Sequence, residues 1–400
     1  MLLKGNRFTN YTDKVYLSVL LMCAGSFWLI GSLLVPVLSY MVLDSSAHDT
    51  RFINYATLIN ILPSLPFLFS AFIASSINAS NFTQVRRFAF MLLLVSGVVL
   101  FSLNIINNVI WLSCYILLVS LIFRAIYFAL DKQIAISLDK KVIQFQSDLL
   151  ILSTIGGAVF TKLGSYIYHN YGVEYCIGLF LVLSLSLVFF SKLIPTVVVA
   201  KAQPNLNLIN IKIILKSLPL VKLIITLSMI TIIQSPFYLL FFIKLHQLNI
   251  PSTSYANILA YSSLFSISAG VLCKFRQIEK IKIAKVIAVC LFLECGLFLV
   301  LAKYVENSIL MIIVYFIFVF LSGIINIQNF AWIIRTIKAD NNLIHFTSFI
   351  NGVIASVFYL CYLFMELLVN MLLNSGMLIS SILSGLIIVT SVFLCYLFRI

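Results

Sequence analysis

One arginine, Arg124, lies in the middle of a stretch that otherwise suits a lipid environment. Residues 117–130 read LLVSLIFRAIYFAL, and Arg124 is the charged residue among them. A charge at the centre of a bilayer costs roughly 2.5–3.5 kcal/mol on insertion scales, and such residues usually face the interior of a helix bundle along a transport pathway. We therefore expect Arg124 to lie in a water-filled cavity, where it binds an anionic part of a ligand or holds a carboxylate.

Two acidic residues could take up and release protons, because burial opposes the charged form of a carboxyl group whereas a nearby cation favours it. Asp131 lies seven residues after Arg124, two helical turns along the same face, with Tyr127 between them. Glu366 lies within a long apolar stretch. We predict proton coupling at Glu366, Asp131 and Arg124. The alternatives are a solvated Asp131 and a Glu366 that stays protonated and bonds to neighbouring backbone.

Uncharged polar side chains within apolar stretches are candidates for contact with a ligand. The most concentrated set is Asn326, Gln328 and Asn329, since three amides within four residues cannot all face lipid without cost. Asn326 and Asn329 are three residues apart and share a helix face. The alternative is hydrogen bonding between helices, worth about 0.6 kcal/mol for each bond. The full set of predicted ligand contacts is Arg124, Tyr127, Trp28, Asn60, Gln234, Tyr261, Asn326, Gln328, Asn329 and Asn351.

Four further ionisable residues receive other interpretations. Lys162 either extends its ammonium to the membrane surface along its own aliphatic stem or meets an anionic group. Asp148 is interpreted as a residue at a helix start or at the membrane interface. His246 and His345 are expected in loops.

The composition places these residues in an integral membrane protein. Hydrophobic residues make up 62% of the 400 residues and charged residues 10%, which leaves too little polar surface to cover a soluble globule. The eight cysteines fall almost wholly within apolar stretches and show neither a disulfide framework nor zinc-ligand spacing, so we expect no metal and no cofactor. The N-terminal residues show no cleavage-site pattern and are not expected to form a removable signal peptide.

Twelve apolar stretches are long enough to cross a bilayer as helices. The predicted fold class is therefore an all-α membrane protein with twelve transmembrane helices. The predicted spans are residues 15–42, 53–77, 88–106, 109–130, 149–168, 175–194, 218–243, 255–273, 284–302, 308–334, 346–373 and 377–398.

The positions of lysine and arginine predict the orientation of these spans. Basic residues precede the first span and follow every even-numbered span, which places both termini in the cytoplasm by the positive-inside rule. The formal charge of +14 is mostly explained in this way, and we expect no nucleic-acid partner. The longest segment between spans divides the chain into an N-terminal six-helix bundle (1–194), a cytoplasmic linker (195–217) and a C-terminal six-helix bundle (218–400).

This arrangement resembles the major facilitator superfamily over essentially the whole chain. The basic pair Arg86-Arg87 follows the second span, and Gly270 with Lys274 and Arg276 echoes it after the eighth. Arg124 matches an arginine that many members carry in the fourth span. The resemblance implies two pseudo-symmetric bundles, a ligand site between them, and a monomer. It also places the ninth span at the periphery, so that Glu294 in its middle receives mainly a structural interpretation.

The fifth span reads GGAVFTKLG at residues 156–164, which resembles the exporter branch that contains siderophore, macrolide and microcin C export proteins. The resemblance implies proton-coupled efflux of a small polar or amphiphilic metabolite, such as a siderophore, a peptide antibiotic or a macrolide, by an antiporter in a bacterial inner membrane. The alternative is an importer of a nutrient such as a sugar or peptide. No catalytic motif occurs in the spans, so we expect no enzyme. The expected partners are a small-molecule substrate, protons and the lipid bilayer.

Overall fold

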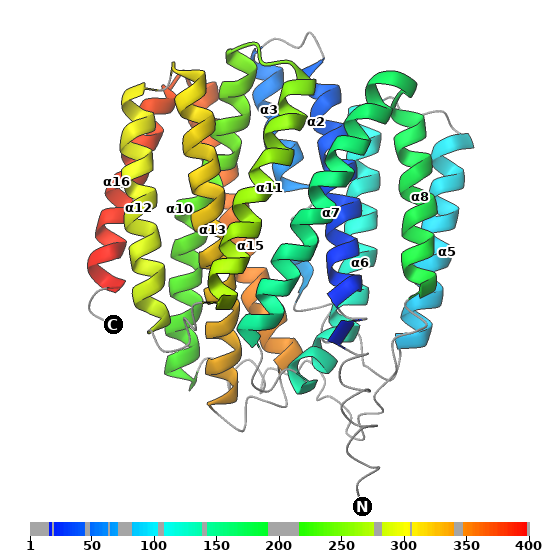
Figure 1. Ribbon diagram of the computed structural model, residues 1–400, viewed down its shortest axis with the longest axis horizontal. Helices are drawn as coiled ribbons and strands as arrows, with labels where there is room; N and C mark the ends of the chain where they lie inside the picture. The colour runs from blue at the N-terminus through cyan, green and yellow to red at the C-terminus, as the bar shows by residue number, and fades with distance from the viewer. Residues whose placement is uncertain are drawn as a thin grey trace, which may run out of the picture.

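The computed structural model describes residues 16–17, 20–44, 49–62, 65–70, 82–102, 108–137, 142–190, 216–275, 282–304, 306–339 and 347–397. Long helices run side by side through this part of the chain as one bundle (Figure 1). Nine helices within the described residues are long and apolar enough to cross a membrane. The protein is therefore a multi-pass membrane protein.

In the first part of the chain, the helix at residues 20–29 continues directly into the first two elements of the following list, and the others are separate elements. These elements are η1 (Ile30–Leu34), α2 (Val35–Leu43), α3 (Asp49–Ile61), η2 (Leu65–Phe69), α5 (Phe82–Ser102), α6 (Val109–Ser137), α7 (Val142–Tyr171) and α8 (Val173–Phe190). The second part contains α10 (Leu218–Gln247), α11 (Ser252–Phe275), α12 (Ile283–Tyr304), α13 (Ser308–Lys338), α15 (Thr347–Asn374) and α16 (Ile379–Leu397).

These helical segments occur at the positions of the predicted spans. The prediction of twelve spans in two bundles remains a prediction, because parts of several spans lie outside the described residues. Most of the predicted linker also lies outside them, since residues 191–215 are not described.

Prolines coincide with the irregular parts of the helices. Pro36 follows the π-helical turn η1, and Pro66 lies within the 3-10 helix η2. Pro236 lies inside α10, where it lacks the N–H that would complete the helical ladder. The described residues of the second predicted span thus fall in two elements, the α-helix α3 and the 3-10 helix η2.

Glycines in α7 allow this helix to approach the first span closely. The indole ring of Trp28 lies against Gly156, and a Cβ atom at Gly156 would come within 2.2 Å of the indole Nε1. Leu33 lies against Gly164 in the same way, 2.9 Å from the place of a Cβ. The glycines at residues 156–164 therefore bring α7 against the first span.

We call the end of the bundle where the described chain starts and ends the terminal end, and the opposite end the distal end (Figure 1). Helices α7 and α11 pack against each other from one end to the other. At the terminal end the Lys274 Nζ atom lies 2.7 Å from Asp148 Oδ1, and at the distal end His169 Nε2 lies 2.9 Å from Ser252 Oγ. This pair of helices joins the two parts of the chain along its length.

Further contacts close the distal end between α3 of the first part and α10 and α15 of the second. Asn54 Oδ1 accepts hydrogen bonds from the side-chain amides of Asn370 and Asn374, each at 3.2 Å. Phe52 stacks on His246, with ring centroids 3.6 Å apart. Polar and aromatic contacts therefore hold the two parts of the chain together at this end.

Candidate functional site

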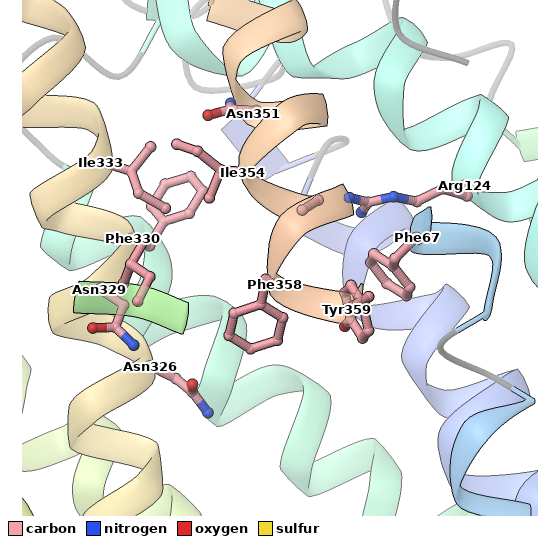
Figure 2. A pocket seen from close by; sticks show the side chains of 12 residues that line it. Phe67, Arg124, Asn326, Asn329, Phe330, Ile333, Asn351, Ile354, Phe358 and Tyr359 are labelled. Carbon is pink, nitrogen blue, oxygen red and sulfur yellow. The ribbon is translucent and has the colours of Figure 1, made fainter. Parts of the chain in front are cut away.

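A pocket of about 250 Å³ lies between the two parts of the chain. Helix α6 and η2 contribute one wall, and α10, α13 and α15 contribute the others. Figure 2 shows side chains from these elements that converge on the pocket. The lining residues are Phe67, Arg124, Leu227, Asn326, Asn329, Phe330, Ile333, Asn351, Ile354, Ala355, Phe358 and Tyr359.

Arg124 brings a positive charge to an aromatic wall of this pocket. Its Cζ atom lies 4.0 Å from the ring centroid of Phe67, and its Nε donates a hydrogen bond to Ser70 Oγ at 3.3 Å. Tyr359 adds a second ring to this wall, because it stacks on Phe67 with a centroid distance of 3.9 Å. A cation over an aromatic face contributes about 0.5–1 kcal/mol at an exposed site and more when desolvated. These contacts orient the guanidinium within the pocket.

Asparagine side chains provide hydrogen-bonding groups from α13 and α15. Asn326 and Asn329 both line the pocket, so the helix face that they share is the face toward it (Figure 2). The Oδ1 atom of Asn329 is buried and has no hydrogen-bond partner among the described residues, and in Figure 2 the amide nitrogen is the atom turned toward the pocket. Asn351 lines the pocket from α15.

Five of the predicted ligand contacts lie away from the pocket lining, and Gln234 is described below with Glu294. Trp28 packs in the first span and donates from Nε1 to the Leu152 carbonyl oxygen at 3.0 Å. Gln328 is fully buried between helices, although it is next to Asn329 in the sequence. The backbone carbonyl oxygen of Asn60 accepts a hydrogen bond from the Tyr362 hydroxyl at 3.2 Å.

Tyr261 is the fourth, and it lies on an exposed face of α11. The side chain of Tyr261 is 57% exposed, and the Lys162 Nζ atom lies 5.8 Å from its ring centroid. Lys162 is itself exposed. This pair faces the outside of the bundle, and the interpretation of Lys162 as a residue that extends to the membrane surface remains a prediction.

Among the acidic residues within spans, Glu366 and Glu294 are both fully buried. The polar group nearest to the Glu366 carboxyl is the Tyr362 hydroxyl, which also donates to the Asn60 carbonyl oxygen at 3.2 Å. Glu294 accepts a hydrogen bond from Gln234, so this predicted ligand contact faces a carboxyl group rather than the pocket. Asp131 and Tyr127 lie in α6, but their side chains are outside the described residues.

The ion pair between Asp148 and Lys274 joins the two parts of the chain, a role that the sequence interpretation did not assign to either residue. Tyr16 donates to the other carboxylate oxygen of Asp148 at 2.7 Å. A sequence signal existed, since an acid near the start of one span and a base at the end of another lie at the same membrane surface. The expectation for His246 was wrong: it lies in the last turn of α10 and stacks on Phe52. His345 lies outside the described residues.

No metal-binding cluster of three or more His, Cys, Asp or Glu side chains occurs in the part of the chain that the structure describes. The pocket instead combines a guanidinium, aromatic rings and amides. These groups can bind the anionic group of a small molecule, cover its apolar body and satisfy its polar atoms. This is the usual composition of a small-molecule site, largely apolar with a few placed polar groups.

The fold is similar to that of several solved membrane transporters. No protein-family model and no curated protein matches the sequence. Among solved structures, the human organic anion transporter MFSD10 is similar with a TM-score of 0.70 and 12% identity, over 96% of this chain and 98% of that one. The POT family transporter PepTSo has a TM-score of 0.67 and 11% identity, over 98% of each chain.

The nucleoside transporter NupG is similar with a TM-score of 0.60 and 14% identity, over 96% of each chain. At these identities the likeness establishes the fold over nearly the whole chain. The all-helical membrane fold expected from the sequence is therefore confirmed, whereas the twelve spans in two bundles remain a prediction.

Proposed function

We propose that this protein is a secondary transporter that moves a small polar or amphiphilic molecule across the membrane by alternating access. The pocket carries the proposal, because it lies between the two parts of the chain and contains Arg124 beside Phe67 and Tyr359. A ligand held there touches helices from both parts. Its binding free energy can therefore bias their relative position, which alternating access requires.

Arg124 binds the anionic group of the ligand in this proposal. A guanidinium presents a planar set of donors that suits a carboxylate or phosphate group. The aromatic residues then cover the apolar body, and the amides of Asn326, Asn329 and Asn351 bind its other polar atoms. The organic anion transporter with the same fold is consistent with this choice of ligand.

The proposed driving force is the proton gradient, with Glu366 as the proton carrier and Asp131 and Arg124 as its partners in coupling. The complete burial of Glu366 beside the Tyr362 hydroxyl, with no cation against it among the described residues, supports this role, since a carboxyl in such a place is neutral unless water or a cation reaches it. The membrane potential supplies about 2.3 kcal/mol per charge for each 100 mV. One proton exchanged for each ligand is sufficient for uphill movement.

The proposed direction is efflux, from a bacterial cytoplasm across the inner membrane, with both termini in the cytoplasm. The distribution of basic residues supports the orientation, and the GGAVFTKLG segment supports export of a siderophore, a peptide antibiotic or a macrolide. The same fold also occurs in nucleoside and POT family transporters, and import of a nutrient by this monomer is the second candidate.

The test begins with ligand binding to purified protein. Thermal-shift measurements with siderophores, macrolides, peptides, nucleosides and aromatic carboxylates should identify a compound that stabilises the wild type. Arg124→Ala should abolish the shift for an anionic compound, whereas the matched control Lys162→Ala, which removes an exposed cation outside the pocket, should retain it. Retained binding in Arg124→Ala would remove this residue from the site. Uptake by oriented vesicles under a proton gradient then distinguishes export from import.

A further inference from the structure

We propose that Glu294, Gln234 and Ser322 form a proton-binding site deep in the second part of the chain, linked to the pocket by α10 and α13. The role of this site in transport rests on the proposed function, whereas the site itself is defined by its hydrogen bonds and burial. Glu294 belongs to α12, Gln234 to α10 and Ser322 to α13. Three helices therefore contribute polar side chains to one point.

The hydrogen bonds of this site are directed to one oxygen of the carboxyl group. Gln234 Nε2 lies 2.8 Å from Glu294 Oε1 and 3.2 Å from Ser322 Oγ. The Ser322 hydroxyl donates to the same Oε1 at 3.4 Å. The other oxygen, Oε2, has no hydrogen-bond partner among the described residues, and Glu294 is 0% exposed.

This asymmetry suits a carboxyl group that binds a proton at Oε2. A buried anion without full compensation is strongly unfavourable, and protonation of the free oxygen removes the charge. The two donors at Oε1 remain in place in both forms, so the carboxylate is also supported when the proton leaves. The site can therefore exist in both states, as reversible proton binding requires.

The surrounding ionisable groups do not neutralise the carboxyl group with an opposite charge. Tyr238 of α10 and Cys290 of α12 face Glu294, and both are neutral in their usual forms. Helix α16 packs on α12, where Ser391 meets Cys295 at 3.8 Å. No lysine, arginine or second carboxyl group faces Glu294 among the described residues. The same lack of further acidic ligands favours a proton over a metal cation.

Two helices connect this site to the pocket. Gln234 follows the pocket residue Leu227 by seven residues on α10, and Ser322 precedes the pocket residue Asn329 by seven residues on α13. Seven residues are two helical turns, about 10 Å, and lie on nearly the same helix face. Pro236 follows Gln234 and interrupts the hydrogen-bond ladder of α10 near this site. A change in the protonation of Glu294 can therefore be transmitted to the parts of α10 and α13 that line the pocket.

Helix α13 also connects the site to the seam between α7 and α11. Gly323 follows Ser322, and a Cβ atom there would lie 3.0 Å from Ala269 Cβ of α11 and 3.4 Å from Leu150 Cδ2 of α7. Such close packing transmits small shifts of α13 to its neighbours. Protonation of Glu294 would then alter both the pocket and the contact between the two parts of the chain.

Infrared difference spectroscopy of the purified protein between acidic and alkaline pH tests the proton site without any ligand. The wild type should show a protonated-carboxyl band that is lost at alkaline pH. Buried Glu366 contributes its own carboxyl signal, so Glu294→Gln should lose the component of the band that belongs to Glu294 and keep the rest. Ser322→Ala should keep the Glu294 component at a shifted frequency because one hydrogen bond to the carboxyl group is gone. The control Glu306→Gln, which removes an exposed carboxylate paired with Lys244 at 2.9 Å, should leave the band unchanged.

A Glu294→Gln spectrum identical to that of the wild type would overturn the proton site, as would a band that responds to sodium at constant pH. The link to the pocket is tested by hydrogen–deuterium exchange in α13, which should depend on pH in the wild type and become independent of pH in Glu294→Gln. Exchange that keeps its pH dependence would refute the link. Failure of the transport proposal would leave the infrared result intact, so the two failures are distinguishable.

Discussion

The Lys274 ammonium and the Asp148 carboxylate lie 2.7 Å apart at the terminal end of the α7–α11 seam. Tyr16 of the first span donates to the second oxygen of the same carboxylate at 2.7 Å. The carboxylate thus joins three segments of the chain, and two of them belong to opposite parts of it. This contact opposes separation of α7 and α11 at the terminal end.

Asp148→Asn should loosen the terminal end of this seam. The Asp148 and Lys274 side chains are 19% and 38% exposed, so the pair is screened by water and contributes about 0.2–1 kcal/mol. Loss of 1 kcal/mol changes a two-state ratio about fivefold. Hydrogen–deuterium exchange should accelerate by up to that factor at residues 142–150 and 268–275.

The exchanged pair Asp148→Lys with Lys274→Asp provides the control, because it restores opposite charges at the same positions. This double variant should exchange more slowly than Asp148→Lys by itself. Equal exchange rates in the two variants would show that the ion pair does not hold the seam.

Asn329 and Gln328 should respond differently to loss of their amides, although they are adjacent in the sequence. Asn329 lines the pocket, and Asn329→Leu should weaken ligand binding by roughly the 0.5–1.5 kcal/mol of one hydrogen bond. Gln328 is fully buried, and both of its amide atoms lack a nitrogen or oxygen partner among the described residues. Gln328→Met should therefore leave binding unchanged.

The variants Gln328→Met and Asn329→Leu should also show that effects on stability and effects on ligand binding come from different residues. Gln328→Met removes an uncompensated buried amide, so the melting temperature in detergent should stay constant or rise. A large drop in melting temperature would indicate that the Gln328 amide is satisfied through the nearby Cys273 thiol. Unchanged ligand affinity in Asn329→Leu would exclude its amide from the site.

The sequence predicted much of the architecture and part of the pocket. Span length and hydrophobicity are properties of local segments, so helix positions followed from them. Arg124 and the helix face shared by Asn326 and Asn329 were identified because polar side chains within apolar helices are unfavourable in lipid and therefore usually face the interior of the bundle. Trp28 and Tyr261 could not be assigned in this way, since aromatic side chains are also favourable against glycine-containing helices and at exposed faces.

Contacts between distant spans were the part that local patterns could not provide. The bond between Gln234 and Glu294 depends on how α10 packs on α12, and 60 residues separate the two in the sequence. The ion pair of Asp148 with Lys274 likewise spans 126 residues. Composition identifies such residues as unusual, but tertiary packing determines which of them meet.

Gly156→Ala should destabilise the packing of α7 on the first span. A Cβ atom at this position would lie 2.2 Å from the Trp28 indole, which must move and lose its 3.0 Å hydrogen bond to the Leu152 carbonyl oxygen. Overpacking of this kind typically costs about 1–3 kcal/mol. The melting temperature in detergent should fall, and Trp28→Leu in the same chain should restore part of the loss.

Gly296→Ala is the matched control, because a Cβ atom there meets nothing within 4 Å. Alanine is favoured over glycine in a helix by about 1 kcal/mol, so this variant should be neutral or more stable. Equal destabilisation by the two substitutions would refute the close contact between Gly156 and Trp28.

Asn54→Leu should have an effect opposite to that of Asp148→Asn. Asn54 Oδ1 accepts hydrogen bonds from Asn370 and Asn374 at the distal end, and amide bonds between membrane helices contribute about 0.6 kcal/mol each on average. Loss of these two hydrogen bonds should change the ratio of molecules with a closed distal end to those with an open one by nearly an order of magnitude. Alternating access opens one end of the bundle as the other closes. Hydrogen–deuterium exchange should therefore accelerate in the distal turns of α3 and α15 and slow in the terminal turns of α7 and α11. If both ends became more exposed in Asn54→Leu, the two sets of contacts would be independent, and the proposed exchange between them would be wrong.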